Sequence, residues 1–177
     1  MLVINLFAGP GAGKSTTAAG LFNIMKIMGH EVELVTEFAK DLTWERRQSA
    51  LENQLYILAK QEYKLSRLEG KVDYVITDSP LLLGLLYTSP RFDTKWFRQA
   101  ALGAWGLYDN ISFFLERTKD YNPNGRNQTR DEAIAIDHRT RELLKELGVH
   151  ADFVKGTMKA PGSIYRIIKE KQDGVRL

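Results

Sequence analysis

The stretch Leu6-Phe7-Ala8-Gly9-Pro10-Gly11-Ala12-Gly13-Lys14-Ser15-Thr16 decides the fold of this chain. The apolar run Leu2–Phe7 is typical of a buried strand, and the following segment, Thr16–Met28, has the pattern of a helix. Glycines between a strand and a helix let backbone N–H groups turn inward around phosphate oxygens, and the helix N-terminus adds positive potential. The sequence therefore predicts a phosphate-binding loop of the G-x-x-x-x-G-K-[ST] type, with Ala8 in place of the first glycine.

The residue types of this loop also predict its chemistry. In such loops the lysine, here Lys14, reaches the β- and γ-phosphates, and the hydroxyl, here of Ser15, binds Mg²⁺. ATP and Mg²⁺ are the cofactors expected. The predicted nucleotide-binding set is Gly9, Pro10, Gly11, Ala12, Gly13, Lys14, Ser15 and Thr16.

Composition indicates one globular domain. The 177 residues suffice for a single core but hardly for two, so one domain is expected over 1–177. The chain has no cysteine, which excludes disulfides and thiolate zinc sites, and its three scattered histidines do not predict a metal site. The N-terminus lacks the basic region of a signal peptide, and no apolar run is long enough to cross a bilayer. We expect a cytoplasmic protein without a membrane partner, and the net charge of +3 allows a nucleic-acid partner without requiring one.

Strand-like and helix-like segments alternate along the chain. This pattern predicts an α/β fold, a three-layer αβα sandwich around a central, mostly parallel five-stranded sheet. The expected strands are Leu2–Phe7, Glu31–Thr36, Tyr74–Thr77, Ile111–Leu115 and Asp152–Val154. The expected helices are Thr16–Met28, one long helix Ser49–Leu68, Thr94–Tyr108, Arg130–Leu147 and Ser163–Lys171.

Carboxylates follow two of the predicted strands, where ligands bind in parallel sheets. Asp78 ends the third strand, and a carboxylate there can hold Mg²⁺, usually through water, or accept a proton from an attacking hydroxyl. Glu37 follows the second strand, where an acceptor would approach the γ-phosphate. Both are predicted catalytic residues, although Asp-Ser-Pro also favours a plain turn, and Glu37 and Asp41 would also suit a helix N-terminus.

A loop at about 118–130 has the composition of a lid. The loop and its flanking residues carry one acidic side chain, Asp120, against four basic ones: Arg117, Lys119, Arg126 and Arg130. Gly125 is expected to add mobility. Guanidinium groups on a closing loop can meet the charge that develops on a transferred phosphoryl group. Arg126 and Arg130 are therefore predicted catalytic residues.

The sequence motifs do not identify which residues would bind the acceptor. Amides and phenols on the predicted long helix and three tryptophans could contact a base, but such side chains more often face solvent or the core. Paired arginines could contact backbone phosphates, but most such pairs only solvate a surface. These candidates are Asn53, Gln54, Tyr56, Gln61, Tyr63, Trp44, Trp96, Trp105, Arg46-Arg47 and Arg91, Lys95 and Arg98.

Several segments together resemble known P-loop kinases. Thr36-Glu37-Phe38-Ala39-Lys40-Asp41 is similar to the Glu-aromatic-Ala-basic segment of nicotinamide riboside kinases, and the order of elements is similar to thymidylate kinase-like enzymes. Asn53–Ala59 and Arg67–Tyr74 resemble the small P-loop kinases of tailed phages, one branch of which phosphorylates 5-hydroxymethyluracil in DNA. The resemblance implies a kinase for a nucleoside-type acceptor, best matched by that base. Asp78-Ser79-Pro80 stands where thymidylate kinases carry an arginine turn, which argues against that enzyme.

Other functions of P-loop proteins fit the sequence less well. A GTPase switch would require D-x-x-G and N-K-x-D motifs, which the sequence lacks, and a motor or helicase would require a longer chain with further motifs. A regulator without catalysis would not need Lys14 and Asp78, and both are present. A kinase of a free nucleoside or nucleotide and a non-kinase P-loop NTPase remain as alternatives, and no oligomeric state is predicted.

Overall fold

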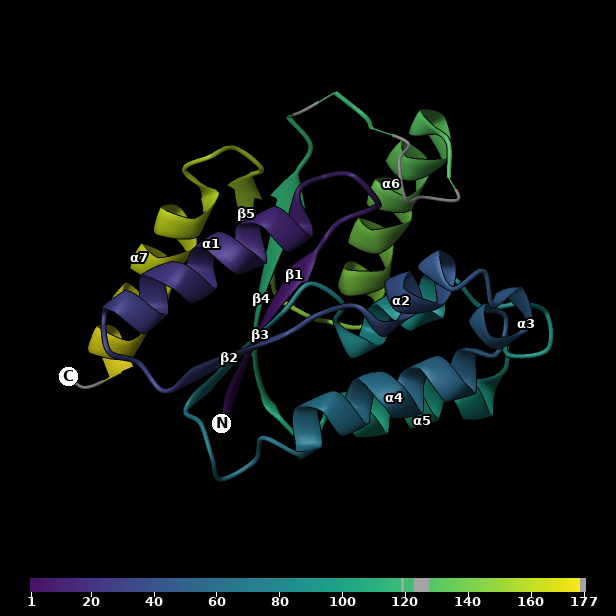
Figure 1. Cartoon of the computed structure of the whole chain (residues 1–177), viewed down its shortest axis with the longest axis horizontal. Coiled ribbons are helices and arrows are strands. Elements are labelled where there is room, and N and C mark those ends of the chain that lie inside the picture. Colours follow the sequence, from purple (N-terminus) through teal and green to yellow (C-terminus); the bar gives the residue numbers. More distant parts are fainter. Residues whose placement is uncertain (119, 123–127, 176–177) are drawn as a thin grey trace.

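The structure is a computed structural model that describes residues 1–118, 120–122 and 128–175. In this part of the chain a sheet of five parallel strands lies between two layers of helices (Figure 1). The strands are β1 Leu2–Phe7, β2 Val32–Val35, β3 Tyr74–Thr77, β4 Asp109–Glu116 and β5 Asp152–Lys155. The helices are α1 Lys14–Ile27, α2 Phe38–Trp44, α3 Gln48–Leu51, α4 Gln54–Ser66, the 3₁₀-helix η1 Leu81–Leu86, α5 Lys95–Trp105, α6 Arg130–Glu146 and α7 Ala160–Val175. The predicted fold class is confirmed.

The strand order places the P-loop at the centre of the sheet. The order is β2-β3-β1-β4-β5, so β1 pairs with β3 on one side and with β4 on the other. In register, Asn5 lies opposite Thr77, and Thr77 lies opposite Val35. The residues that follow these three positions therefore emerge side by side at the carboxyl edge of the sheet, where the P-loop begins.

Alternate residues of the strands build two cores. Ile4, Leu6 and Phe113 face α1 and α7, which supply Leu21, Met25, Ile164 and Ile168. Val3 and Val75 face α4 and α5, and Phe7 and Phe114 pack with η1 and α6. Because both faces of the sheet are covered, the strands carry near-continuous apolar runs, as parallel strands usually do.

Three features of the chain differ from the sequence-based expectation. The predicted long helix Ser49–Leu68 is wrong, because α3 ends at Leu51 and α4 starts anew after Asn53, whose side chain accepts a hydrogen bond from Tyr56 N–H at 3.2 Å. The short helices α2 and η1 were not predicted, since neither is long enough to show a period. The last helix begins at Ala160, because Pro161 is well tolerated in a first turn.

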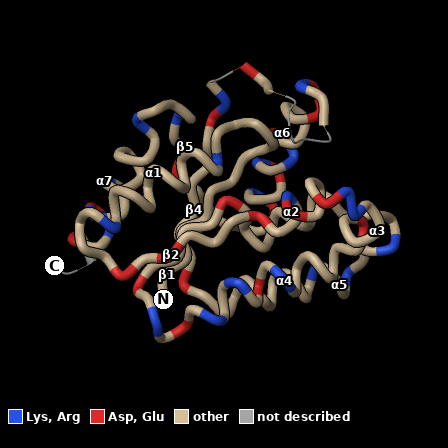
Figure 2. The backbone as a smooth tube through the Cα atoms, in the orientation of Figure 1, with Lys and Arg blue, Asp and Glu red and all other residues tan. Residues whose placement is uncertain are grey.

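Charge lies mainly on the helices and loops. In Figure 2 both signs alternate along α4 and α6, whereas the centre of the sheet is uncharged. Among the described residues, no helix combines the length and the apolar character needed to cross a bilayer.

Candidate functional site

The first turn of α1, at the end of the P-loop, leaves its backbone donors available for a ligand. Gly11 and Gly13 have positive φ values of 77° and 102°, a conformation that favours glycine. Gly13 precedes α1 as its N-cap, and no side chain caps that helix end. The N–H groups of the first turn are therefore free to bind an anion. Ser15 and Thr16 are exposed on this turn.

Lys14 lies inside the loop and bonds to its backbone. Its Nζ donates to Ala8 O at 2.8 Å and to Gly9 O at 3.1 Å. Burial lowers the pKa of Lys14, and the nearby carboxylates of Glu37, Asp78 and Asp137 act in the opposite direction. The carbonyl oxygens hold the ammonium group at the loop, and three acidic side chains lie close enough to affect its charge.

Asp78 lies directly beyond the end of β3, beside the strand that leads into the P-loop. The residue is only 3% exposed, and its Oδ1 has no hydrogen-bond partner among the described residues. A buried carboxylate oxygen without a partner is costly, so Asp78 Oδ1 is suited to binding a cation or a metal-bound water. Mg²⁺ is usually bound by one or two protein oxygens together with water and phosphate. Asp78 and the Ser15 hydroxyl fit that donor set, although no cluster of three or more potential metal-ligating side chains occurs in the described ranges.

Glu37 presents a second carboxylate at the same edge. It is the N-cap residue of α2, but its side chain does not cap that helix. Burial raises the pKa of Glu37, Lys14 lowers it, and Asp78 raises it further. A carboxyl group with a raised pKa that is not used in a structural hydrogen bond has the properties of a general base.

Gln61, on α4, fixes the backbone on both sides of Glu37. Its Oε1 accepts from Phe38 N–H at 3.1 Å, and its Nε2 donates to Thr36 O at 3.4 Å. The same Nε2 lies 3.5 Å from Thr77 Oγ1, at the end of β3. This amide, 3% exposed, therefore connects the two strand ends that carry Glu37 and Asp78.

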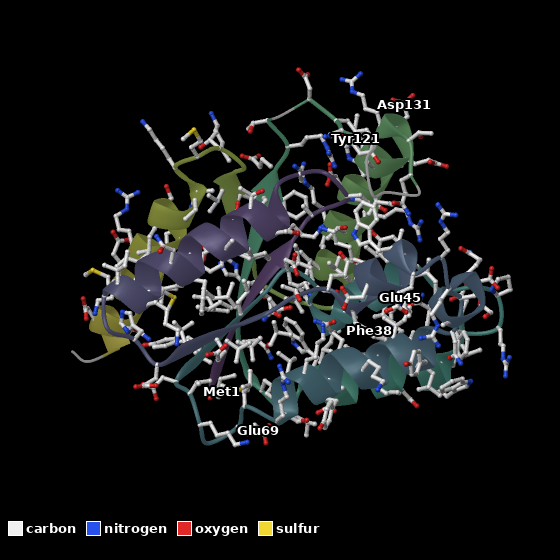
Figure 3. All side chains as sticks on the ribbon, viewed as in Figure 1. Met1, Phe38, Glu45, Glu69, Tyr121 and Asp131 are labelled. Carbon is white, nitrogen blue, oxygen red and sulfur yellow. The ribbon has the colours of Figure 1, made fainter. Side chains whose placement is uncertain are left out.

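The start of the predicted lid lies against the P-loop. Arg117 follows β4, and its Nη2 donates to Pro10 O at 2.8 Å, while its Nε donates to Asp137 Oδ2 at 2.9 Å. The ring of Tyr121 packs within 2.9 Å of the position that a Cβ of Gly11 would occupy. In Figure 3 Tyr121 lies above the loop that joins β1 to α1.

The predicted catalytic arginines are distributed differently. Arg126 lies outside the described residues. Arg130 is exposed on the first turn of α6, behind an N-terminal cap in which Thr129 and Glu132 bond to each other's backbone. Lys14, Glu37 and Asp78 are thus brought together. Among the described residues at the start of the lid, the cation that lies near them is Arg117.

Tyr87 lies at the same site from the C-terminal end of η1. Burial and the charges of Glu37 and Asp137 raise the pKa of its phenol, so Tyr87 is protonated at neutral pH. Arg139, on α6, donates from Nη2 to Leu86 O at 3.1 Å and so joins η1 to α6 beside Tyr87. The phenol therefore lies close enough to the carboxylates of Glu37 and Asp137 for their charges to act on it.

Sequence reasoning missed Asp137, whose Oδ1 accepts from Gly9 N–H at 2.6 Å. One signal was available, since Asp137 belongs to the buried stripe of α6 together with Ala133, Ile136 and Thr140. An acidic residue on the apolar stripe of a helix must have a buried partner. The identity of that partner, 128 residues away, depends on the tertiary fold.

The acceptor candidates fall into two groups. Gln54 and Gln61 are buried rather than solvent-facing, and Trp105 packs on Phe7 with ring centroids 6.0 Å apart. Trp44 is 65% exposed and Trp96 is 50% exposed. Only the exposed group offers surface for a large acceptor.

Comparison with known families agrees with this geometry. A family model described as "AAA domain" matches residues 3–160, which include the whole P-loop and, except for Leu2, all the residues of the five strands. A search of curated proteins gave no match. Membership of a P-loop family implies nucleotide binding and NTPase-type or kinase-type activity. The chain belongs to the AAA domain family of P-loop proteins.

Proposed function

We propose that this protein is an ATP- and Mg²⁺-dependent kinase that transfers the γ-phosphoryl group to a hydroxyl of a nucleoside-type acceptor. One observation carries the proposal: Glu37 and Asp78 lie near Lys14 at the P-loop, and among the described residues Asp78 Oδ1 has no hydrogen-bond partner and the Glu37 side chain does not cap α2. A hydrolytic NTPase can use the same pair, with water in place of the acceptor, so the choice of a kinase rests in addition on the resemblance of 36–41 and 53–59 to P-loop kinases. A kinase needs one carboxylate for the metal ion and one for the acceptor proton.

The residues divide the reaction between them. The acceptor oxygen forms a bond to the γ-phosphorus while the bond from that phosphorus to the β–γ bridging oxygen breaks, and ADP leaves. Glu37 takes the proton of the acceptor hydroxyl. Ser15 and Asp78 would hold Mg²⁺, which neutralises charge on the phosphates when bound. Lys14 and the free N–H groups of the P-loop bind the phosphate oxygens.

The acceptor we propose is the hydroxymethyl group of 5-hydroxymethyluracil in phage DNA. The resemblance of the chain to tailed-phage kinases supports this acceptor, and so does the surface beyond Glu37. Helix α2 leads from Glu37 to the exposed Trp44 over about 10 Å, and the exposed Arg46 and Arg47 follow. Aromatic and cationic side chains in sequence suit a strand of nucleic acid. Such a base must leave the duplex stack before its hydroxyl can reach the γ-phosphate.

Two alternatives are kept. A kinase of a free nucleoside or nucleotide, including nicotinamide riboside-like acceptors, would use the same carboxylates with a smaller acceptor. A non-kinase P-loop NTPase is also compatible with the family match. The identity of the phosphoryl acceptor distinguishes both alternatives from the proposed function.

A transfer assay with γ-labelled ATP tests the proposal. Duplex DNA containing 5-hydroxymethyluracil, the free deoxynucleoside and its monophosphate are offered in parallel over a salt series. We expect label in the DNA, and transfer that falls steeply with salt because phosphate contacts release counterions. Lys14→Ala should abolish transfer while circular dichroism stays unchanged. Preferred labelling of the free nucleoside or nucleotide would replace the DNA acceptor, and release of inorganic phosphate alone, unaffected by any acceptor, would refute the kinase.

A further inference from the structure

Asp137 joins three parts of the site. It lies in the middle of α6, and it is 9% exposed. Its Oδ1 accepts from the P-loop Gly9 N–H at 2.6 Å, and its Oδ2 accepts from Arg117 Nε at 2.9 Å. A Cβ on Gly9 would come within 2.9 Å of Asp137 Oδ1, so the glycine permits this close approach. The carboxylate thus fixes one P-loop peptide and one arginine at the same time.

Arg117 uses only part of its guanidinium in this arrangement. Nε bonds to Asp137, and Nη2 bonds to Pro10 O, but Nη1 is buried without a hydrogen-bond partner among the described residues. That nitrogen lies 3.3 Å from the position of a Cβ on Gly11, over the phosphate-binding turn. A buried, charged donor without a partner is costly. A phosphate oxygen bound in the loop would supply the missing acceptor.

We propose that Asp137 is a positioning residue that holds Arg117 so that Nη1 meets an oxygen of the transferred phosphoryl group. The fork of a guanidinium has a fixed geometry, so two of its nitrogens held by Asp137 and Pro10 determine the direction of the third. A cation placed before the reaction stabilises developing charge without reorganisation. The proposal rests on phosphoryl transfer at this P-loop, whatever the acceptor is.

A purely structural ion pair makes a different prediction from a positioning residue. Both side chains of the Arg117–Asp137 pair are 13% exposed, so breaking the pair would affect stability in either case. If Asp137 positions Arg117, breaking the pair should in addition weaken binding of the transition state more than binding of the product nucleotide. The variant Asp137→Asn separates the two roles. Asn Oδ1 can still accept from Gly9 N–H, but its NH₂ group faces Arg117 Nε, donor against donor.

The test compares the affinity for Mg²⁺·ADP with that for Mg²⁺·ADP·aluminium fluoride, a mimic of the phosphoryl group in transfer. Both are measured by calorimetry on the full chain, so no acceptor is needed. We expect Asp137→Asn to weaken the aluminium fluoride complex by about tenfold or more and ADP binding by less than about threefold. Arg117→Ala should have the same selective effect, and the double variant should be no worse than Arg117→Ala. Glu142→Gln, an exposed acid on the same helix, is the control and should change neither affinity.

Equal loss of both affinities in Asp137→Asn, or no loss, would overturn the proposal. If Asp137→Asn fails to fold by circular dichroism, Arg117→Lys replaces it, because it keeps the charge but not the fork that Asp137 orients, and it should lose the aluminium fluoride preference as Arg117→Ala does. If Arg117→Ala still binds Mg²⁺·ADP·aluminium fluoride more tightly than Mg²⁺·ADP by the wild-type ratio, Arg117 does not contact the transferred phosphoryl group and the proposal is refuted. A failed kinase assay is a separate outcome, since these affinities report the phosphate site alone.

Discussion

At the scale of single residues, the ionised carboxylate that Glu37 needs as a base is disfavoured by its buried position in the folded chain. Its carboxyl group is desolvated beside Asp78, and burial raises its pKa. The folded chain therefore favours the protonated form of Glu37 more than the unfolded chain does. The stability that this preference contributes is fully present below the unfolded pKa and is lost as the pH rises through the folded pKa.

We expect Glu37→Gln to lower turnover by about 10²–10⁴-fold, since the base is lost. In the absence of nucleotide the same variant should melt at a higher temperature than the wild type at pH 8, because glutamine imitates the uncharged carboxyl group. The difference should vanish near pH 4. Melting curves across this range check the sign, with the exposed Glu45→Gln on the same α2 segment as control. A stability difference that does not depend on pH would contradict the assignment of Glu37.

At the scale of elements, α4 supports the site through Gln61 and through Lys64, whose Nζ donates to Thr36 O at 3.1 Å. Gln61 bonds to the backbone on both sides of Glu37 and approaches Thr77. The sequence shows an amphipathic helix here, but its period cannot distinguish a glutamine that contacts solvent from one that bonds to strand ends. The break at Asn53 was equally hidden, because the apolar residues continue across it with nearly helical spacing.

Two buried glutamines of α4 provide a matched comparison. Gln61→Leu and Gln54→Leu each remove a buried amide, and each should lower the free energy of unfolding by about 1–3 kcal/mol. Within the described part of the chain, the one side-chain hydrogen bond of Gln54 goes to Leu51 O at 3.1 Å, so its loss should leave turnover near the wild-type value. Gln61→Leu should lower kcat and move the acid limb of the pH profile, because Glu37 is displaced from Asp78. Denaturant unfolding and pH–rate profiles check both, and equal turnover in the two variants would show that Gln61 is only structural.

At the scale of the whole molecule, the parts readable from the sequence are those fixed by local patterns. The P-loop, the alternation of strands and helices and the strand-end carboxylates all follow from short stretches of chain. The strand order does not, and it is this order that brings Asp78 and Glu37 to the P-loop. Contacts such as Asp137 with Gly9 depend on packing between distant segments, so no short pattern reveals them.

Ligand binding should stabilise the molecule as a unit. At a Mg²⁺·ATP concentration of about 100 times Kd, a one-site ligand adds about 2.7 kcal/mol, which for a chain of this size raises Tm by roughly 5–10 °C. Thermal scans with and without EDTA measure this shift. Lys14→Ala should lose most of it, whereas Lys71→Ala, an exposed lysine far along the chain, should keep it. An unchanged shift in Lys14→Ala would contradict the nucleotide site.

The position of β1 also determines when the protein can fold during its synthesis. Leu2, at the start of β1, which is made before the other four strands of this sheet, pairs with Tyr74 on one side and with Asp109 on the other. At about 5–20 residues per second, a ribosome needs roughly 5–20 s to reach the second of these partners. Throughout this time the apolar segment Leu2–Phe7 lacks at least one of its two neighbours in the sheet, and such segments pair readily with other nascent chains. Slow growth at low temperature and access to a chaperone that shields the newly made β1 should therefore decide how much of the protein is recovered in active form.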